Sequence, residues 1–509
     1  MAIVNIGFSE FLEDNIKEIT DKYDWMKTRT FKLCKTIEEF KEFIDKAIEF
    51  GHCVLDLETN GLSTRIKKVD NKIVSVTTIV GFCLCYDTTF AIYVPINHLE
   101  DAEYNLPEKK TLDEIKRLCT NCKVIFHNAK YDVALLKNYG IIISDYKMFE
   151  DTIILGRLYD AGTKETGLKK LSEKLLNQPM LELKEVTGGE NRFDLISPNV
   201  GYIYGGSDAI CTFDLYKFFE KQDIIKQQEF IYNLEKRIVF VVIEMESHLI
   251  KINIPYLLEI RKKAEERIEK LTKEIYELVN HEFNIDSPLQ LGKILFDELE
   301  YEYPQKRKTT TGQYITDDKT MKKIAEKYPL VQKILEYRNL KKLTGTYIKK
   351  LLLNTDKEGF VKLSFNQVGT DTGRFSSPGG AGLEIDGYSG VNFQSMPKKP
   401  DKKNPELDLR KAFTVRDPSK TMVAIDYENE EMRVATNLSN ETVWIDAIKK
   451  GVDFTIYKKT PDGLQNEITL FALWGKLIQE GLQSENKDII ILAKQLKSKV
   501  VNIQLREFP

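Results

Sequence analysis

From Phe31 to about Phe219 the chain alternates between strand-like and helix-like segments, and no other feature of the sequence constrains the fold as strongly. Apolar runs typical of strands lie at Cys53–Leu57, Ile73–Tyr86, Thr89–Val94 and Val124–Phe126. Helical patterns cover Glu38–Phe50, Leu112–Leu118, Tyr131–Tyr139 and Asp208–Phe219. Alternation of this kind predicts an α/β domain. We assign it residues 31–222, after a lead-in at residues 1–30.

The rest of the chain changes character twice. Residues 223–357 have helical patterns and many charges, and Leu258–Phe283 has the periodicity of a long amphipathic helix. From Phe360 onward Gly, Ser and Pro become frequent, and a strand candidate at Thr421–Asp426 precedes a helix candidate that ends at Leu438. The length of 509 residues, at roughly 150 per domain, fits about three domains. We place the third at residues 358–509.

Two carboxylates stand at the end of the first strand. Asp56 and Glu58 are two residues apart, so the strand period of two puts both on one face. Adjacent like charges repel each other, and a divalent cation would relieve that repulsion. The alternative is a strand-end turn over Leu57–Gly61 with solvated acids, and the pair alone does not decide between the two.

Two further polar pairs follow at helix spacing. Asn128 comes after a short apolar strand and can cap the next helix, with Asp132 one turn further on. Tyr204 and Asp208 are four residues apart, which places them on one helical face if a helix begins nearby. Taken singly, the first pair is also consistent with a capped helix that carries an exposed Asp. In the second, Ser207 or Asp208 could equally be a simple helix cap.

In this order the three elements resemble the signature of the four-carboxylate 3′→5′ exonucleases, in the branch that carries a tyrosine four residues before its last aspartate. The resemblance implies a ribonuclease H-like fold. It implies that Asp56, Glu58, Asp132 and Asp208 bind two Mg²⁺ ions, with Mn²⁺ as an alternative, since hard cations prefer oxygen ligands. One ion would activate a water and the other would stabilise the leaving 3′ oxygen. Tyr204 would orient the water, and Asn128 would contact the DNA.

The second half of the chain carries motifs of a different kind. Their order and spacing resemble the thumb and early palm of a family A DNA polymerase, the bacterial DNA polymerase I type, from about residue 30 to about residue 460. The motifs are Lys341–Tyr347, Asp371–Ser377, Asn392–Pro397, Arg410–Phe413 and Ala424–Arg433. The fold class expected from this resemblance is an α/β exonuclease domain, a mostly helical thumb, and an incomplete α+β palm.

The resemblance also implies roles for individual residues of these motifs. Asp426 corresponds to the first metal-binding carboxylate of the palm, and the backbone carbonyl of Tyr427 would add a ligand. Glu431 corresponds to the glutamate near the sugar of the incoming nucleotide. Arg374, Asn392 and Gln394 would contact the primer–template, and their donors suit phosphates and minor-groove acceptors, which vary little with sequence.

The sequence departs from the family after Asp426. No His-Asp-Glu turn follows, although the family uses that turn for its second palm carboxylate. Lys499 stands at the lysine of the nucleotide-binding helix, but Gln495 replaces the arginine and the likeness ends after Asn502. Two-metal phosphoryl transfer needs both carboxylates. We therefore expect that this chain alone does not polymerise, and that a second polypeptide carrying the remaining fingers and palm would be needed before dNTPs are used.

Two rival functions remain open at this stage. A stand-alone 3′→5′ exonuclease would explain the carboxylates, but it would have no use for the Thr372–Ser377 and Asp426–Arg433 motifs. A non-catalytic DNA-binding subunit would have no use for an intact set of exonuclease residues. The expected partners are primer–template DNA and single-stranded 3′ ends.

Cysteine usage and charge bear on the cellular setting. The seven cysteines are an odd number, and we found no secretory signal and no long apolar run, which favours the cytoplasm (the host cytoplasm for a viral protein) and no membrane. Cys119-x-x-Cys122 is one half of a zinc pattern, but Cys83-x-Cys85 has the wrong spacing for the other half, so we predict structural or incidental cysteines. The net charge is −3, so DNA binding would depend on local basic patches.

Overall fold

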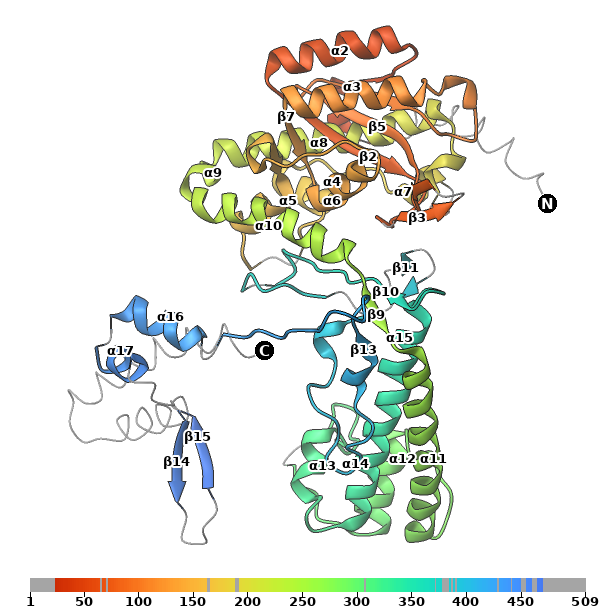
Figure 1. The fold of residues 1–509 in the computed structure, drawn as a ribbon, viewed down its shortest axis with the longest axis vertical. Helices are drawn as coiled ribbons and strands as arrows, with labels where there is room; N and C mark the ends of the chain where they lie inside the picture. The colour runs from red at the N-terminus through yellow and green to blue at the C-terminus, as the bar shows by residue number, and fades with distance from the viewer. Residues whose placement is uncertain are drawn as a thin grey trace. The chain divides into compact units, whose positions relative to one another are not determined.

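The computed structural model divides the chain into two compact units, Met1–Lys420 and Thr421–Pro509, and each is described by itself (Figure 1). It describes the following residues: 23–64, 66–69, 72–162, 165–187, 192–305, 308–370, 372–377, 384–385, 388–389, 391–427, 430–440, 442–449, 455–459 and 465–469.

A six-stranded mixed sheet forms the centre of the first part of unit 1, in the order β1-β6-β5-β2-β7-β8. β5 runs antiparallel to both β2 and β6, whereas the pairs β1–β6, β2–β7 and β7–β8 are parallel. The strands are β1 (Thr30–Leu33), β2 (His52–Thr59), β5 (Ile79–Cys85), β6 (Phe90–Pro95), β7 (Lys123–Phe126) and β8 (Phe149–Asp151). A separate hairpin joins β3 (Ile66–Val69) to β4 (Lys72–Ser75).

Helices cover both faces of this sheet. On one face α2 contacts α3 and β2, and on the other α8 crosses β1, β6, β5 and β2. The core between these layers is apolar, and it includes Phe40, Leu55, Phe82, Phe126 and Phe213. The helices of this part are α2 (Ile37–Phe50), α3 (Glu108–Asn121), α4 (Ala129–Asn138), α5 (Thr152–Tyr159), α6 (Leu168–Leu171), α7 (Leu183–Thr187), α8 (Pro198–Lys221), α9 (Ile224–Gln227) and α10 (Glu229–Ser247).

Local signals in the sequence explain where these helices begin and end. Thr36 caps α2 by accepting a hydrogen bond from the backbone N–H of Glu39 at 3.1 Å, and Gly51 ends the helix in the left-handed conformation. Ser197 caps α8, and Pro198 occupies its first turn. This cap starts α8 well before Asp208, where the sequence pattern placed the beginning of the helix. The predicted run Ile73–Tyr86 is two strands, because it bends between β4 and β5.

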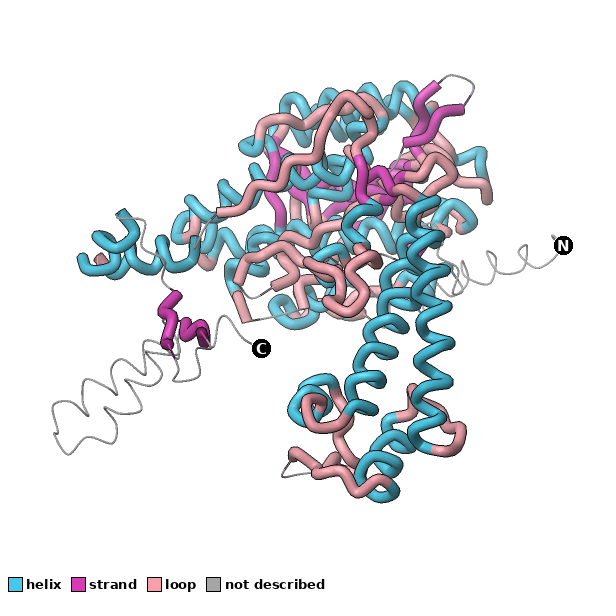
Figure 2. Tube along the Cα trace, turned by 60° about the horizontal axis from the view of Figure 1, so that its bottom comes forward, coloured by secondary structure: helices cyan, strands magenta, loops and turns pink. Residues whose placement is uncertain are grey.

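The second part of unit 1 is mostly helical, as the cyan segments of Figure 2 show. The long helix α11 packs along α14 through a stripe of apolar residues that includes Leu257, Ile260, Leu271 and Ile275. Its helices are α11 (Ile254–Val279), α12 (Pro288–Lys293), α13 (Asp318–Ile324), α14 (Pro329–Lys342) and α15 (Lys349–Asn354). A small antiparallel sheet orders its strands β10-β9-β13, at Phe360–Val361, Ile250–Ile252 and Phe413–Thr414, and a hairpin pairs β11 (Glu384–Ile385) with β12 (Tyr388–Ser389). The predicted fold class, an α/β domain followed by a helical region, is confirmed.

Unit 2 contains two helices and a hairpin among its described residues: α16 (Glu430–Ser439), α17 (Thr442–Lys449), β14 (Thr455–Lys459) and β15 (Gln465–Thr469). The strand predicted at Thr421–Asp426 is wrong. Residues 421–427 have no regular structure, no described strand pairs with them, and Ile425 is 89% exposed. An apolar segment needs a neighbouring strand for its backbone groups before it forms a strand. Within the described part of the chain, no helix has the length and apolar character that crossing a membrane requires.

Candidate active site

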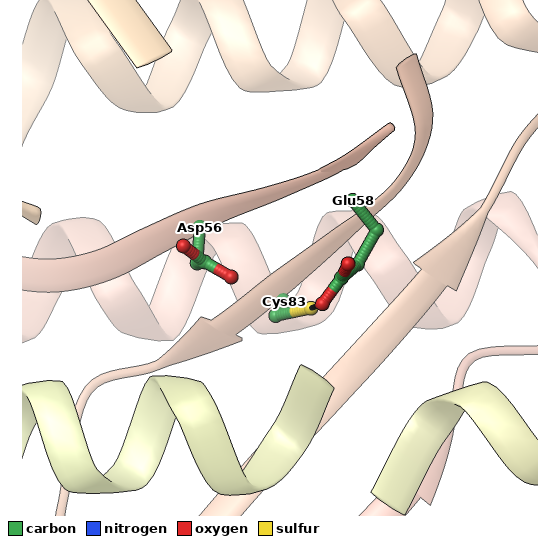
Figure 3. Close-up of side chains that lie close together, drawn as sticks. All are labelled: Asp56, Glu58 and Cys83. Atoms are coloured by element: carbon green, nitrogen blue, oxygen red, sulfur yellow. Dashed lines mark hydrogen bonds between the residues drawn. The ribbon is translucent and has the colours of Figure 1, made fainter. Parts of the chain in front are cut away.

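The first carboxylate pair lies on β2, facing α8. In the antiparallel pairing of β2 with β5, Asp56 is opposite Cys83 and Glu58 is opposite Gly81, so all four positions share one face of the sheet. The side chains of Asp56, Glu58 and Cys83 point toward one another, and their ligand atoms lie within 4.8 Å of each other (Figure 3). The alternative of two solvated acids in a turn fails for Glu58, which is 8% exposed.

Asp132 reaches this site from the first turn of α4. That helix follows β7, and β7 runs parallel to β2, so both strands end at the same edge of the sheet. Asn128 precedes the helix in the left-handed conformation, with φ 74°. Its side chain makes no capping hydrogen bond, so the predicted cap is wrong. The carboxylate of Asp151 caps α4 instead, because it accepts hydrogen bonds from the backbone N–H groups of Asn128 at 3.0 Å and Ala129 at 2.9 Å.

Tyr204 and Asp208 lie on one face of α8, which the sequence had left conditional on a helix in this region. Two glycines between them allow the helix to approach the sheet closely. A Cβ atom on Gly205 would lie 2.1 Å from Cys83 Sγ and 3.3 Å from Glu58 Oε1, and one on Gly206 would lie 2.7 Å from the ring of Phe31. Gly205-Gly206 therefore serves close helix–sheet packing.

Asp56 interacts electrostatically with each of the other three carboxylates, so it lies near all of them. Burial raises the pKa of Asp56 to about 6. Burial, followed by the charge of Asp56, raises the pKa of Asp208 to about 8. Burial and then the charges of Asp56 and Asp208 raise the pKa of Glu58, and burial and then the charge of Asp56 raise that of Asp132. Without a counter-charge, the site disfavours its own ionisation.

Such a donor set suits a divalent cation that prefers oxygen ligands. Carboxylate oxygens come from β2, α4 and α8, and a bound cation would relieve the repulsion that raises their pKa values. Asp56 is partly exposed, so the site is open to solvent on that side. The chemistry of the donors therefore fits the metal ions that the carboxylate pattern predicts.

Three residues near the site were missed by the sequence analysis. Asp151 ends a strand and precedes a helix, a capping signal that could have identified it. Lys169 lies with its Nζ 5.1 Å from the centre of the Tyr204 ring, and its charge lowers the pKa of Asp208. Tyr131 donates a hydrogen bond to the carbonyl of Gly61 at 2.8 Å, beyond the end of β2. No local pattern marks Lys169 or Tyr131, because each is identified only by its neighbours in space.

Replacing Gly205 with alanine should distort this site. The added Cβ would overlap Cys83 Sγ, and Cys83 is fully buried on a central strand, so the helix or the strand must move. We expect a loss of about 1–3 kcal/mol in the free energy of unfolding, typical of overpacking, together with weaker metal binding. Chemical denaturation measures the first effect, and Gly345→Ala is the matched control because a Cβ atom at that position would meet no neighbouring side chain within 4 Å. Equal stability of the two variants would contradict this packing.

The predicted primer-contacting residues lie in the second part of unit 1. Arg374 is exposed and follows Gly373, which has φ 75°. Both ends of the Gln394 side-chain amide are engaged, since Nε2 donates to the carbonyl of Phe375 at 2.6 Å and Oε1 accepts from the N–H of Ser377 at 2.9 Å. Gln394 thus holds the Arg374 loop in place. Asn392 Oδ1 accepts from the N–H of Ser395 at 3.1 Å.

The predicted palm residues belong to unit 2. Asp426, Tyr427 and Glu431 are exposed, and an open pocket is lined by Asp426, Tyr427, Glu430, Arg433 and Val434. Asp426 lies in a segment without regular structure, so the prediction that it ends a strand is wrong. Lys499 lies outside the described residues.

Two family models match the chain in the order of its parts. Residues 31–223 match a model described as 3′-5′ exonuclease, and residues 254–467 match one described as DNA polymerase family A. Similar curated proteins include DNA polymerase I of Treponema pallidum, 26% identical over 82% of this chain and 42% of that protein. DNA polymerase I of Synechocystis is 30% identical over 70% of this chain and 35% of that protein. This chain thus spans less than half the length of either relative.

A solved structure shares the fold. It is titled as the POL domain of Pol1 from M. smegmatis in complex with DNA primer-template and dNTP, and it matches with a TM-score of 0.63. The alignment covers 93% of this chain and 70% of that one, at 18% sequence identity. At this identity the similarity shows the fold alone.

Proposed function

We propose that this chain, whose residues 31–223 match the 3′-5′ exonuclease model and residues 254–467 the DNA polymerase family A model, removes nucleotides from the 3′ ends of DNA with the help of Mg²⁺. The observation that supports the proposal is that Asp56 on β2 interacts electrostatically with Asp132 on α4, and with Tyr204 and Asp208 on α8. Three separate segments of the chain have no packing reason to bury acids together.

The residues of the site divide the work of phosphodiester hydrolysis. Asp56, Glu58, Asp132 and Asp208 would hold two Mg²⁺ ions, which supply an activated water and stabilise the leaving oxygen. Burial, followed by the charges of Asp208, Glu58 and Asp56, raises the pKa of Tyr204, so its hydroxyl keeps its proton and can donate a hydrogen bond to the attacking water. Asp151 positions α4, and with it Asp132, through its two backbone hydrogen bonds.

The polymerase part is proposed to bind primer–template DNA. Arg374 supplies an exposed fork of donors suited to phosphate, and Gln394 fixes its loop. The proposed contacts with DNA or a dNTP come from Asn128 near the exonuclease site and from Asn392, Gln394, Tyr427, Glu431 and Lys499 on the polymerase side. Asp426 keeps its proposed metal. The comparisons give no support to a second polypeptide, and the cytoplasmic location stays a prediction.

A single assay separates this proposal from its rivals. The purified chain is incubated with single strands labelled at the 5′ end, with Mg²⁺ or with excess EDTA. We expect a ladder of products shortened from the 3′ end with Mg²⁺ and no change with EDTA. An intact substrate under both conditions would indicate a DNA-binding subunit. The same reactions with a primer–template and dNTPs test DNA synthesis. A chain that degrades single strands, but does not bind the primer–template and degrades the primer equally with and without dNTPs, would be a stand-alone exonuclease.

A further inference from the structure

The thiol of Cys83 faces the carboxylates proposed to bind Mg²⁺ and has no role in that chemistry. We propose that Cys83 completes, together with Asp56 and Glu58, a binding site for a thiophilic divalent cation such as Zn²⁺ or Cd²⁺, which displaces Mg²⁺ and inhibits the exonuclease. The inhibition rests on the proposed function, whereas the binding of the cation does not.

The fold fixes the position of this sulfur atom. Cys83 is paired with Asp56 across β2 and β5, so their side chains leave the sheet on the same side. Gly205 of α8 lies directly over Cys83, at a distance that excludes even a methyl group. The thiol therefore has no space toward the helix, and it lies beside Glu58 (Figure 3).

The distances are those of a metal site that includes one sulfur. Cys83 Sγ lies 3.8 Å from Glu58 Oε1, and the three ligand atoms lie within 4.8 Å of one another. A tetrahedral Zn²⁺ with bonds of about 2.3 Å to sulfur and about 2.0–2.2 Å to oxygen separates those two ligand atoms by about 3.5 Å. A shift of a few tenths of an ångström would thus bring Cys83 Sγ and Glu58 Oε1 to the separation of two ligands on one ion. The Asp56 oxygen, which lies within 4.8 Å of both, would complete the site by a side-chain movement of up to about 1 Å, with water as a fourth ligand.

The sulfur would also give this site a selectivity that oxygen ligands lack. Mg²⁺ is a hard cation with little affinity for thiolate, whereas Zn²⁺ and Cd²⁺ bind it strongly. When the cation binds, the thiol proton passes to solvent and the thiolate becomes the ligand. Cys83 thus strengthens the binding of soft cations without contributing to the binding of Mg²⁺.

Cadmium tests the direct bond, because a cadmium–thiolate bond has its own ultraviolet charge-transfer band. The full-length protein is titrated with Cd²⁺ without DNA, in parallel with Cys83→Ser and Cys85→Ser variants. Cys85 is the matched control, since it lies on the same strand and the same face under α8, but its thiol contacts the carbonyl of Ala209 at 3.2 Å and no carboxylate. We expect the band in the parent and in Cys85→Ser, and its loss in Cys83→Ser.

Inhibition provides the second measurement. The Zn²⁺ concentration that halves each protein's own Mg²⁺-supported rate should rise at least about tenfold in Cys83→Ser, since loss of even an indirect metal contact costs that much affinity. A Cys83→Ala variant replaces Cys83→Ser if the serine variant fails to fold. A band that persists without Cys83 would overturn the proposal, as would unchanged sensitivity to Zn²⁺. If the band depends on Cys83 but the parent degrades no DNA, only the proposed nuclease function fails.

Discussion

Replacing Asp56 and Glu58 together by alanine is expected to abolish degradation from the 3′ end. The two carboxylates are the part of the proposed metal site that β2 contributes, and Asp56 influences the pKa of every other carboxylate in it. Metal ions contribute several kcal/mol to hydrolysis, which corresponds to a rate loss of about a thousandfold or more. The initial rate of shortening of a 5′-labelled strand measures this loss.

The same double variant should still fold and bind DNA, which separates lost chemistry from lost structure. Removing two buried like charges relieves repulsion, so the variant should be at least as stable as the metal-free parent at neutral pH. Its affinity for a primer–template should stay within about a factor of three, a change of well under 1 kcal/mol. If the variant is unfolded, its loss of activity does not test the metal site, and the milder pair Asp56→Asn with Glu58→Gln is used instead.

The second large effect concerns the dependence of stability on pH and metal. In the folded metal-free protein the pKa of Asp56 is about 6 and that of Asp208 about 8, whereas an unfolded Asp has a pKa of about 3.9. Between these values the folded state binds more protons than the unfolded state, so these groups make the free energy of unfolding fall as pH rises from about 4 to about 8. Mg²⁺ favours the ionised carboxylates, so it should stabilise the protein strongly at pH 8 and only slightly at pH 5.

Chemical denaturation at the two pH values, with Mg²⁺ or with EDTA, measures this linkage. The Asp56→Ala, Glu58→Ala variant is the control, because other titrating groups such as His98 remain in it and cancel in the comparison. Its stabilisation by Mg²⁺ should be small at both pH values. A parent that gains the same stability from Mg²⁺ at pH 5 and at pH 8 would contradict the assignment of these carboxylates to a metal site.

The sequence was informative where a short pattern carries the whole signal. Strand alternation and helix periodicity predicted the strand β2 and the long helix α11 to within a few residues, because these patterns reflect which face of an element is buried. The spacing of Asp56 with Glu58, and of Tyr204 with Asp208, placed each pair on one face for the same reason. The prediction that these pairs lie close together came from the order of the motifs along the chain, and no single helix or strand contains that order.

Features that depend on contacts between distant segments could not be predicted in this way. The cap on α4 comes from Asp151, on a neighbouring strand, and not from the adjacent Asn128. Cys83 seemed incidental because Cys83-x-Cys85 has the wrong spacing for a zinc knuckle and lies in a strand-like run, yet strand pairing places Cys83 opposite Asp56. The strand predicted at Thr421–Asp426 is wrong because a strand-like composition does not supply a neighbouring strand for pairing.

The central claim is that Asp56, Glu58, Asp132 and Asp208 form the metal site of a 3′→5′ exonuclease. The most direct test compares the initial rates at which the parent and the Asp56→Ala, Glu58→Ala variant shorten a 5′-labelled single strand in Mg²⁺. We expect steady shortening from the 3′ end by the parent, and a rate lower by about a thousandfold or more for a variant that is folded and binds DNA. Equal rates for the two proteins would contradict the claim.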